Sequence, residues 1–432
     1  MTKISRRDWM RGLLGAAILE GFEEGEAMGW PDPEETGLEH VVVVMMENRS
    51  FDHMLGWLPN ARGMQQGLTY VDRDGAEHST HHLAGDTKGC VHPDPSHSYQ
   101  GGREQLNGGS MDGFLRSGRN DAFAIGYYRE NDRPFLGALA RNYTTLDRYF
   151  CSVLGPTYPN RFFQHAAQTD RVTNTLEISK LPTIWDQLEA RGVSARYYYS
   201  NVPFLALWGA KYARIAAPYR RFLADAAAGT LPAVSFVEPR FTLGGGSRSN
   251  DDNPHADIRA GDWFLARTFR ALSRGPGWPR TAFIVNYDEW GGFFDHVAPP
   301  RAAAPNGADP DVVDGRALLG FRVPAVVASP WTRGNPSLPR VGRTAFDHTS
   351  VLKLIQWRWG VPPLTARDGS NDTGNLAELF RWDSPDPGVP RLPRPWPPRP
   401  RACAPKAFAD ERDDTWTPLI ESGVTDGWPI YE

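Results

Sequence analysis

The chain contains 432 residues, of which 40% are hydrophobic and 23% are charged, and its formal net charge is -4 at pH 7. This balance is typical of a globular protein and excludes general disorder, and the lack of a basic block interleaved with aromatic residues argues against nucleic-acid binding. The length exceeds that of a usual single core, and 43 glycines and 37 prolines favour many loops, so we expect one main domain with long insertions.

The N-terminal segment, residues 1–37, is similar to a twin-arginine export signal. Paired arginines, Arg6 and Arg7, precede an aromatic residue and an apolar stretch over residues 12–19. The stretch is short, and glutamates follow it without a small-residue cleavage site, so the signal is weak. We expect export to the periplasm or the medium, with a cytoplasmic location as the alternative. The sequence has no apolar run of the roughly 18 residues that span a bilayer.

The first predicted strand covers residues 41–46, an uninterrupted apolar run. Such a run is typical of a strand that is buried on both faces in the middle of a parallel sheet. Glu47 and Asn48 follow directly, in a polar turn that leads into a helix. At the carboxyl end of a strand, where open α/β sheets bind ligands, a carboxylate beside a carboxamide offers hard oxygens to a divalent cation. The alternative is an ordinary surface turn after a core strand.

Residues 60–121 show little periodicity and many Gly, Asp, His and Asn residues, so we expect a long, ordered loop insertion. The three cysteines, Cys90, Cys151 and Cys403, are far apart and have no CxxC spacing. They indicate neither a zinc ribbon nor a disulfide framework, and they leave room for one disulfide bond.

A helix is predicted to begin near Thr157, after a short apolar run and the turn made by Gly155 and Pro156. The start of a helix concentrates free N–H groups and the positive end of the helix dipole, so it can cradle a phosphate. The alternative is that Thr157 only caps the helix.

Helices and strands alternate along the rest of the chain, as in an α/β protein. We expect helices over residues 134–140, 181–191, 256–272 and 351–359, and strands over residues 193–199, 231–238, 281–287 and 323–329. The strand over residues 281–287 runs directly into Asp288 and Glu289. Adjacent carboxylates repel unless they are solvated or held by a cation, so this pair is a candidate metal half-site that complements Glu47 and Asn48. Residues 385–405, rich in proline and arginine, predict an extended arm over the surface.

Six stretches of the sequence together resemble a known family. They are residues 47–53 (ENRSFDH), 96–97 with 111–114 (SH and MDGF), 155–161 (GPTYPNR), 287–297 (YDEWGGFFDHV), 321–324 (FRVP) and 346–350 (FDHTS). Their content and order are similar to those of the bacterial phosphoesterases that include phosphatidylcholine-type phospholipases C and a class of acid phosphatases, within the alkaline-phosphatase-like superfamily. The resemblance implies a three-layer α/β/α sandwich with a mostly parallel central sheet and long loop insertions. It places a catalytic domain at residues 38–380, followed by a Pro/Arg-rich extension over residues 381–432.

The resemblance also implies roles for individual residues. One divalent metal ion would be held by Glu47, Asn48, Asp288, Glu289 and the side-chain oxygen of Thr157, which would be the nucleophile. His97 and His255 would face the reacting phosphoryl group. His296 and His348 also lie in matching motifs, with an indirect or structural role as the alternative.

These residues predict a hydrolase of phosphate esters. We expect a phospholipase C-like phosphodiesterase that acts on phosphatidylcholine-type phospholipids through a metal-activated Thr157 and a phosphothreonine intermediate. The alternatives are a broad-specificity acid phosphatase and, from another class, a non-catalytic protein that binds phospholipid or a partner on the same scaffold. A sulfatase is disfavoured because Thr157 stands where a formylglycine would need Cys or Ser. The expected partners are a phosphate-ester or phospholipid substrate and, transiently, a membrane surface, but no nucleic acid.

Overall fold

The computed structural model describes residues 29–243, 248–403, 415–429 and 431. The twin-arginine motif that begins at residue 5 lies outside the described residues. Within them, no helix combines the length and the apolar character needed to cross a membrane.

A single eight-stranded sheet forms the centre of the molecule. Its strands, in spatial order, are β15 (Arg340–Gly342), β6 (Thr144–Leu146), β14 (Val326–Ala328), β10 (Thr281–Tyr287), β1 (His40–Met46), β9 (Val234–Val237), β7 (Ala195–Tyr199) and β8 (Ala216–Pro218). Both pairings of β14 are antiparallel, and all the others are parallel. The predicted mostly parallel central sheet is therefore confirmed.

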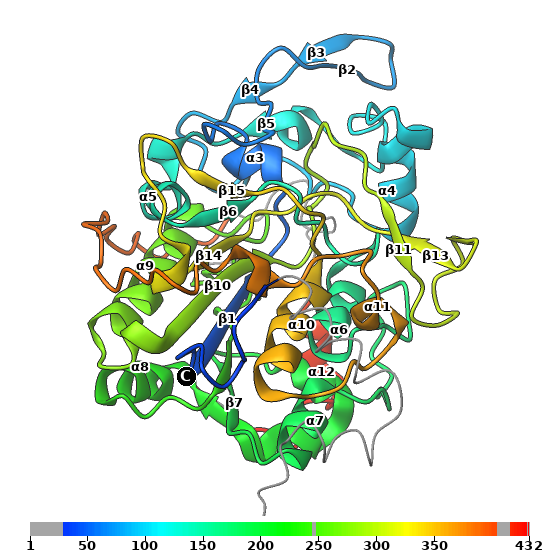
Figure 1. Cartoon of the computed structure of the whole chain (residues 1–432). Coiled ribbons are helices and arrows are strands. Elements are labelled where there is room, and N and C mark those ends of the chain that lie inside the picture. Colours follow the sequence, from blue (N-terminus) through cyan, green and yellow to red (C-terminus); the bar gives the residue numbers. More distant parts are fainter. Residues whose placement is uncertain (1–28, 244–247, 404–414, 430, 432) are drawn as a thin grey trace, which may run out of the picture.

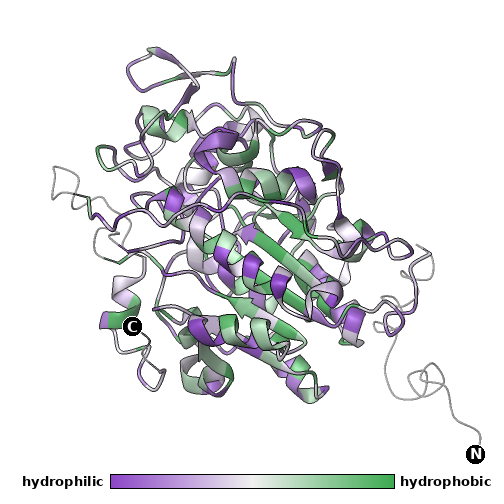
Figure 2. Ribbon diagram, turned by 90° about the vertical axis from the view of Figure 1, so that its left-hand side faces the viewer, coloured by the Kyte–Doolittle hydropathy of each residue, from purple (hydrophilic) through white to green (hydrophobic). Residues whose placement is uncertain are grey.

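Helices cover both faces of this sheet (Figure 1). One layer contains α5 (Pro134–Asn142), α8 (Tyr219–Ala228) and α9 (Ile258–Arg274), and the other contains α6 (Thr157–Ala166), α7 (Ile184–Ala190) and α10 (His348–Trp359). Figure 2 shows the hydrophobic strands in the interior, between helices that mix hydrophilic and hydrophobic residues. This arrangement is the predicted three-layer α/β/α sandwich.

Smaller elements complete the fold. The strands are β2 (Thr69–Val71), β3 (Glu77–Ser79), β4 (His81–His82), β5 (Gly126–Tyr127), β11 (Arg301–Ala303), β12 (Val312–Val313) and β13 (Arg316–Leu318). The α-helices are α3 (Phe51–Leu55), α4 (Tyr99–Leu106), α11 (Ala366–Gly369) and α12 (Thr417–Glu421). The 3-10 helices are η1 (Asn107–Gly109), η2 (Ala122–Ile125), η3 (Glu130–Asp132), η4 (Phe204–Ile215), η5 (Trp278–Arg280), η6 (Pro330–Thr332) and η7 (Leu376–Leu379).

Strand β1 occupies the position that its composition predicts. It lies between β10 and β9, and none of the residues Val41–Met46 is more than 3% exposed. A strand with neighbours on both edges and helices on both faces has no solvent-facing side, which explains its uninterrupted apolar run.

The insertion over residues 60–121 contains more regular structure than its sequence predicts. It includes the β2–β3 hairpin, strand β4 and helix α4. The sequence of α4 has no apolar stripe. Instead, the Ser98 hydroxyl caps the helix by accepting the Gly101 N–H, and Gly102 packs so closely on Leu154 and Trp290 that a Cβ would lie 2.8 Å from Leu154. Capping and tertiary packing therefore form this helix, and periodicity could not reveal it.

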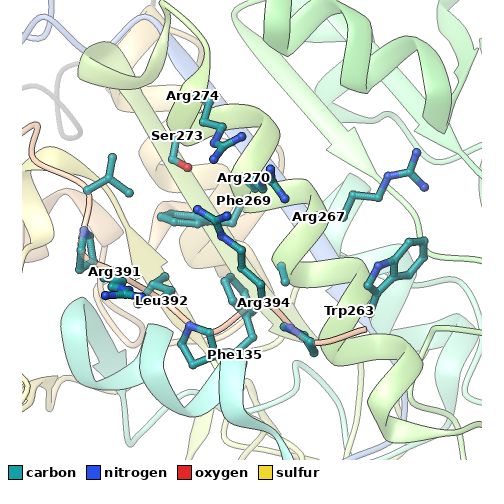
Figure 3. Close-up of a pocket in the computed structure, with 15 residues that line it drawn as sticks. Phe135, Trp263, Arg267, Phe269, Arg270, Ser273, Arg274, Arg391, Leu392 and Arg394 are labelled. Atoms are coloured by element: carbon teal, nitrogen blue, oxygen red, sulfur yellow. The ribbon is translucent and has the colours of Figure 1, made fainter. Parts of the chain in front are cut away.

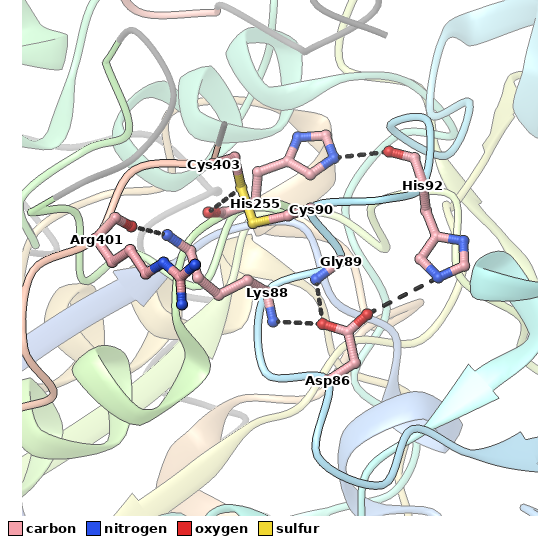
Figure 4. The surroundings of a disulfide bond; sticks show 8 residues. All are labelled: Asp86, Lys88, Gly89, Cys90, His92, His255, Arg401 and Cys403. Atoms are coloured by element: carbon pink, nitrogen blue, oxygen red, sulfur yellow. Dashed lines mark hydrogen bonds and ion pairs between the residues drawn. A yellow bond between two sulfur atoms is a disulfide. The ribbon is translucent and has the colours of Figure 1, made fainter. Parts of the chain in front are cut away.

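A disulfide bond joins Cys90 in this insertion to Cys403 in the C-terminal arm, with the two Cα atoms 5.4 Å apart. The third cysteine, Cys151, is free and buried. Figure 4 shows the bond and its surroundings, where Lys88 donates a hydrogen bond to the Arg401 carbonyl. Residues 385–403 contain no helix or strand, as expected for an extended arm.

Replacing Cys403 with serine should lower the free energy of unfolding by about 2–5 kcal/mol, because the bond closes a long loop in the unfolded chain. The bond spans a sequence separation of 313 residues. Urea unfolding followed by circular dichroism would measure the loss. A reductant should shift the wild-type midpoint but leave that of Cys403→Ser unchanged. An equal shift in both proteins would contradict the prediction.

Candidate active site

Two core strands deliver acidic residues to one edge of the sheet. In the parallel pairing of β1 with β10, Met46 lies opposite Tyr287, so Glu47 and Asp288 leave adjacent strands at the same level. The Asn48 N–H donates to Asp288 Oδ1 at 3.0 Å, and the Asp288 N–H donates to the Met46 carbonyl at 3.1 Å. Four side chains from these two turns are fully buried, namely those of Glu47, Asn48, Asp288 and Glu289.

The turns themselves depend on unusual backbone conformations. Asn48 has a φ of 56°, a left-handed conformation that asparagine tolerates better than most residues. Gly291 in the opposing turn has a φ of 62°, and a Cβ there would lie 2.0 Å from the Asn48 carbonyl oxygen. A side chain at residue 291 would therefore push the Asn48 backbone away from Asp288.

Thr157 approaches Asn48 from the helical layer that contains α6, α7 and α10. It is the first residue of α6, and its Oγ1 donates to Asn48 Oδ1 at 3.4 Å. Pro156 occupies the N-cap position, so the alternative that Thr157 only caps the helix is wrong. The helix end also offers fewer N–H groups than the sequence suggested, because the Tyr158 N–H donates to Asn174 and Pro159 has none.

Arg161, one turn further along α6, supplies positive charge to the carboxylates. Its Nε lies 3.1 Å from Asp288 Oδ2, and its Nη1 lies 2.9 Å from Glu238 Oε2. Burial raises the pKa of Asp288, and the Arg161 guanidinium opposes this shift. Arg161 lies in the motif over residues 155–161, but the sequence alone did not reveal its contact with Asp288.

Glu47 has an environment that suits binding of a cation. Burial raises the pKa of Glu47 well above its ordinary value, and the Asp251 and Asp288 carboxylates raise it further. Glu47 Oε2 meets no N–H or O–H donor in the described part of the chain. The neighbouring Asp251 could share a hydrogen bond with it only if one of the two carboxyl groups were protonated. Buried carboxylate, amide and hydroxyl oxygens are donor types that divalent metal ions prefer, so the chemistry of these residues suits such an ion. The carboxylate oxygens of Glu47, Asp288 and Glu289 do not all lie within 4.8 Å of one another, because among the described residues only Asp52, Asp295 and His296 form such a group.

Trp416, a residue without a predicted role, contacts the other carboxylate oxygen of Glu47. Its indole Nε1–H donates to Glu47 Oε1 at 2.8 Å. Its ring stacks on Phe241, with the ring centroids 3.8 Å apart, and lies 5.3 Å from the Arg161 guanidinium carbon. A residue from the predicted C-terminal extension is thus part of the wall of this site.

The two histidines with predicted catalytic roles occupy different positions. His97 Nε2 lies 4.0 Å from Glu289 Oε1, and its Nδ1 lies 2.9 Å from the Pro95 carbonyl, which favours the proton on Nδ1 when the ring is neutral. His255 Nε2 lies 3.0 Å from the His92 carbonyl, beside the disulfide (Figure 4). The structure thus brings His97 to Glu289 and places the ring of His255 against the loop that carries His97.

His348 supports the site through the backbone. Its Nε2 lies 2.7 Å from the Asp288 carbonyl oxygen, and its Nδ1 lies 3.3 Å from the Tyr149 hydroxyl. Burial lowers the pKa of His348 to about 4, so the ring is neutral near pH 7. A neutral imidazole that holds the Asp288 backbone has an indirect, structural role.

A second acidic cluster consists of Asp52, Asp295 and His296. Ligand atoms of Asp52, Asp295 and His296 lie within 4.8 Å of one another, so this triad could also hold a metal ion. However, the Arg322 guanidinium already bonds Asp295 at 2.9 Å and Asp52 at 3.0 Å. His296 Nδ1 lies 2.5 Å from Asp52 Oδ2. Because Arg322 balances much of the negative charge, we interpret this cluster as a structural ion network.

Helix α6 contains another buried ionisable group, His165, packed among Trp185, Phe204 and Phe236. Burial lowers the pKa of His165 to about 3, and the Arg161 guanidinium lowers it in the same direction. The folded protein therefore holds this histidine in its neutral form across the physiological range.

His165 should make the folded protein less stable as the pH falls below about 6.5, because the unfolded chain then binds a proton at this residue that the folded chain excludes. This loss of stability should grow by about 1.4 kcal/mol for each unit by which the pH falls between about 6.5 and 3. Urea unfolding at pH 7, 6 and 5 should show a flatter pH dependence for His165→Phe than for the wild type. Phe236→Leu, the control from the same cluster, should be less stable at every pH with an unchanged slope. Equal slopes for His165→Phe and the wild type would contradict the prediction.

The sequence of the chain is similar to those of known proteins over most of its length. A model described as the Phosphoesterase family matches residues 38–362. The chain is 33% identical over 404 residues to Non-specific phospholipase C1 of Arabidopsis thaliana, covering 83% of this chain and 75% of that protein. It is also 33% identical over 459 residues to Phospholipase C B of Mycobacterium tuberculosis, covering 89% and 84% of the two chains.

A protein in the alkaline phosphatase superfamily from Vibrio parahaemolyticus aligns over 91% of this chain and 89% of its own, with a TM-score of 0.37 and 11% identity. The family model and the sequence relatives, which cover most of the chain, confirm the predicted family. This chain belongs to the Phosphoesterase family and is a phosphoric ester hydrolase.

Proposed function

We propose that the protein is a phospholipase C-like phosphodiesterase that acts on phosphatidylcholine-type phospholipids. The observation that carries the proposal is the contact of the Thr157 hydroxyl with Asn48, beside the buried carboxylates of Glu47 and Asp288. The similarity to proteins named phospholipase C supports a phosphodiester substrate.

One divalent metal ion would be held by five candidate ligands, which are Glu47, Asn48, Thr157, Asp288 and Glu289. When bound, such an ion supplies positive charge that lowers the pKa of a coordinated hydroxyl and balances the phosphoryl oxygens. Trp416 orients Glu47 by donating to Oε1, which leaves Oε2 for the ion.

In this mechanism, Thr157 Oγ loses its proton to solvent and attacks phosphorus from the side opposite the leaving oxygen. The new oxygen–phosphorus bond forms as the bond to the lipid alcohol breaks, giving phosphothreonine. Protonated His97 donates a proton to the departing alkoxide. Neutral His97 then accepts a proton from the water that attacks phosphorus, while the bond between phosphorus and Thr157 Oγ breaks and Thr157 Oγ regains a proton from solvent. His255 is assigned to stabilising the negative charge on the phosphoryl oxygens.

The test is hydrolysis of p-nitrophenylphosphorylcholine and p-nitrophenyl phosphate, each with and without a chelator. We expect faster turnover of the phosphorylcholine diester, loss of activity with the chelator, and recovery when a divalent cation is added in excess. Preference for the monoester would favour a broad-specificity acid phosphatase. No hydrolysis of either ester under any metal condition would favour a non-catalytic binding protein and contradict the proposal.

We also propose export and a two-part organisation of the chain. The Cys90–Cys403 disulfide supports export, because such bonds persist mainly in oxidising compartments. The proposed catalytic domain comprises residues 38–380, and the extension over residues 381–432 supports it through Trp416 and the disulfide. Fractionation of the producing cells would test the location, and a protein found only in the cytoplasm would contradict export.

A further inference from the structure

A groove of about 580 Å³ lies between helix α9 and the C-terminal arm (Figure 3). Its apolar lining includes Phe135 from α5, Trp263 and Phe269 from α9, and Leu392 from the arm. Helix α9 belongs to the layer on the other side of the sheet from α6, which carries Thr157. The groove is therefore separate from the candidate active site.

The polar lining of this groove is strongly cationic. It contains five arginines, Arg267, Arg270, Arg274, Arg391 and Arg394, and none of its lining residues is acidic. Figure 3 shows these arginines coming from both walls, three from α9 and two from the arm. The spacing of the three on α9 places them along one face of the helix. This concentration of positive charge contrasts with the net charge of -4 of the whole chain.

The positive charges of the groove repel one another. The nearby guanidinium groups of Arg274 and Arg394 lower the pKa of Arg270. Carboxylates balance the buried arginines of the core, such as Arg161 and Arg322, whereas the groove lining contributes no such group. A bound anion would relieve this repulsion, and the planar guanidinium is well suited to phosphate.

The apolar surface around the groove indicates the kind of anion. Trp396, which immediately follows the arm residues that line the groove, is 88% exposed, and Val389 in the lining is 45% exposed. A largely exposed tryptophan beside cationic side chains is typical of surfaces that lie at a membrane interface. A free phosphate ion would leave both apolar side chains in water, whereas an acidic bilayer would contact them and the arginines together.

We propose that this groove binds the headgroups of acidic phospholipids and docks the protein on an anionic bilayer. Arg270 and Arg394, one from each wall, contact the lipid phosphates, and Trp396 enters the interfacial region. This docking site goes beyond the proposed hydrolysis, because it does not use the residues grouped around Thr157.

The test is co-sedimentation of the full-length protein with vesicles of phosphatidylcholine alone or with phosphatidylglycerol added. Thr157→Ala prevents turnover of the lipid during the experiment, and the wild type with chelator serves as a second preparation. We expect tighter binding to the acidic vesicles, with an affinity about 25-fold lower for the double variant Arg270→Gln/Arg394→Gln. Trp396→Ala should also weaken binding, while its circular dichroism remains that of the parent protein.

The matched control is Arg214→Gln/Arg221→Gln, which removes the same charge from exposed positions outside the groove lining. Equal losses in the two double variants would overturn the proposal, because net charge alone would explain them. So would equal binding to both kinds of vesicle, or stabilisation by millimolar inorganic phosphate that depends on Arg270 without any vesicle binding. Hydrolysis of soluble p-nitrophenylphosphorylcholine should be unchanged in Arg270→Gln/Arg394→Gln, so failure of docking and failure of the proposed function give separate results.

Discussion

Replacing Thr157 with alanine should lower the turnover of p-nitrophenylphosphorylcholine by at least about a thousandfold, because no other group can form the covalent intermediate in the proposed mechanism. The substitution removes one long hydrogen bond to Asn48, so the stability cost should be about 1 kcal/mol. Steady-state kinetics together with thermal unfolding would separate a loss of chemistry from a loss of structure.

Two controls sharpen this experiment. Thr157→Ser keeps a hydroxyl and should retain measurable turnover, whereas Thr157→Val matches the shape of threonine and should be as inactive as alanine. Rapid acid quenching of the wild type with a phosphorus-labelled diester should trap label on the protein, and Thr157→Ala should trap none. Near-normal turnover by Thr157→Ala would show that another group is the nucleophile.

Replacing Arg322 with methionine should have the largest effect on stability, a loss of about 3–5 kcal/mol, because it leaves two buried carboxylates without their cation. The Arg322 guanidinium bonds Asp52 and Asp295, and it also donates to the Arg62 and Asp147 carbonyls. Urea unfolding at pH 7 would measure the loss. Arg322→Lys keeps the charge but not the forked geometry, so it should be of intermediate stability.

The pH dependence of this loss provides an internal check. Burial raises the pKa of Asp295 to about 6, although Arg322 opposes the shift, so the pKa should rise further in Arg322→Met. A carboxyl group whose pKa is higher in the folded than in the unfolded chain makes the folded protein more stable as the pH falls. The gap between wild type and variant should therefore narrow from pH 7 to pH 5. A gap that stays constant or widens would show that packing, and not charge, causes the loss.

The parts of the fold that the sequence predicted well are those with a local signal. Strand β1 is an apolar run after its first residue, and β10 is largely apolar, because helices cover both sides of the sheet. Acidic residues follow each strand directly, where the sheet meets the active-site edge. Helix α9, expected over residues 256–272, spans Ile258–Arg274. Strand β14 was expected over residues 323–329 but pairs only over Val326–Ala328.

The parts that could not be predicted depend on contacts between distant residues. Whether an arginine such as Arg161 or Arg322 is buried depends on which carboxylates the fold brings to it, although both lie in motifs that the sequence analysis quoted. Three cysteines allow three pairings, and only the course of the C-terminal arm selects Cys90 with Cys403. Helix α4 has no apolar stripe because two of its glycines, and not large side chains, face the core.

The hydrogen bond from Trp416 to Glu47 joins residues 369 positions apart in the sequence. The ribosome therefore synthesises the acidic residue early and its indole partner 369 residues later. A nascent or proteolysed polypeptide that stops before Trp416 can pair the strands of its sheet but lacks the group that orients Glu47. The wall of the candidate site around Glu47 is therefore completed only after translation has passed Trp416.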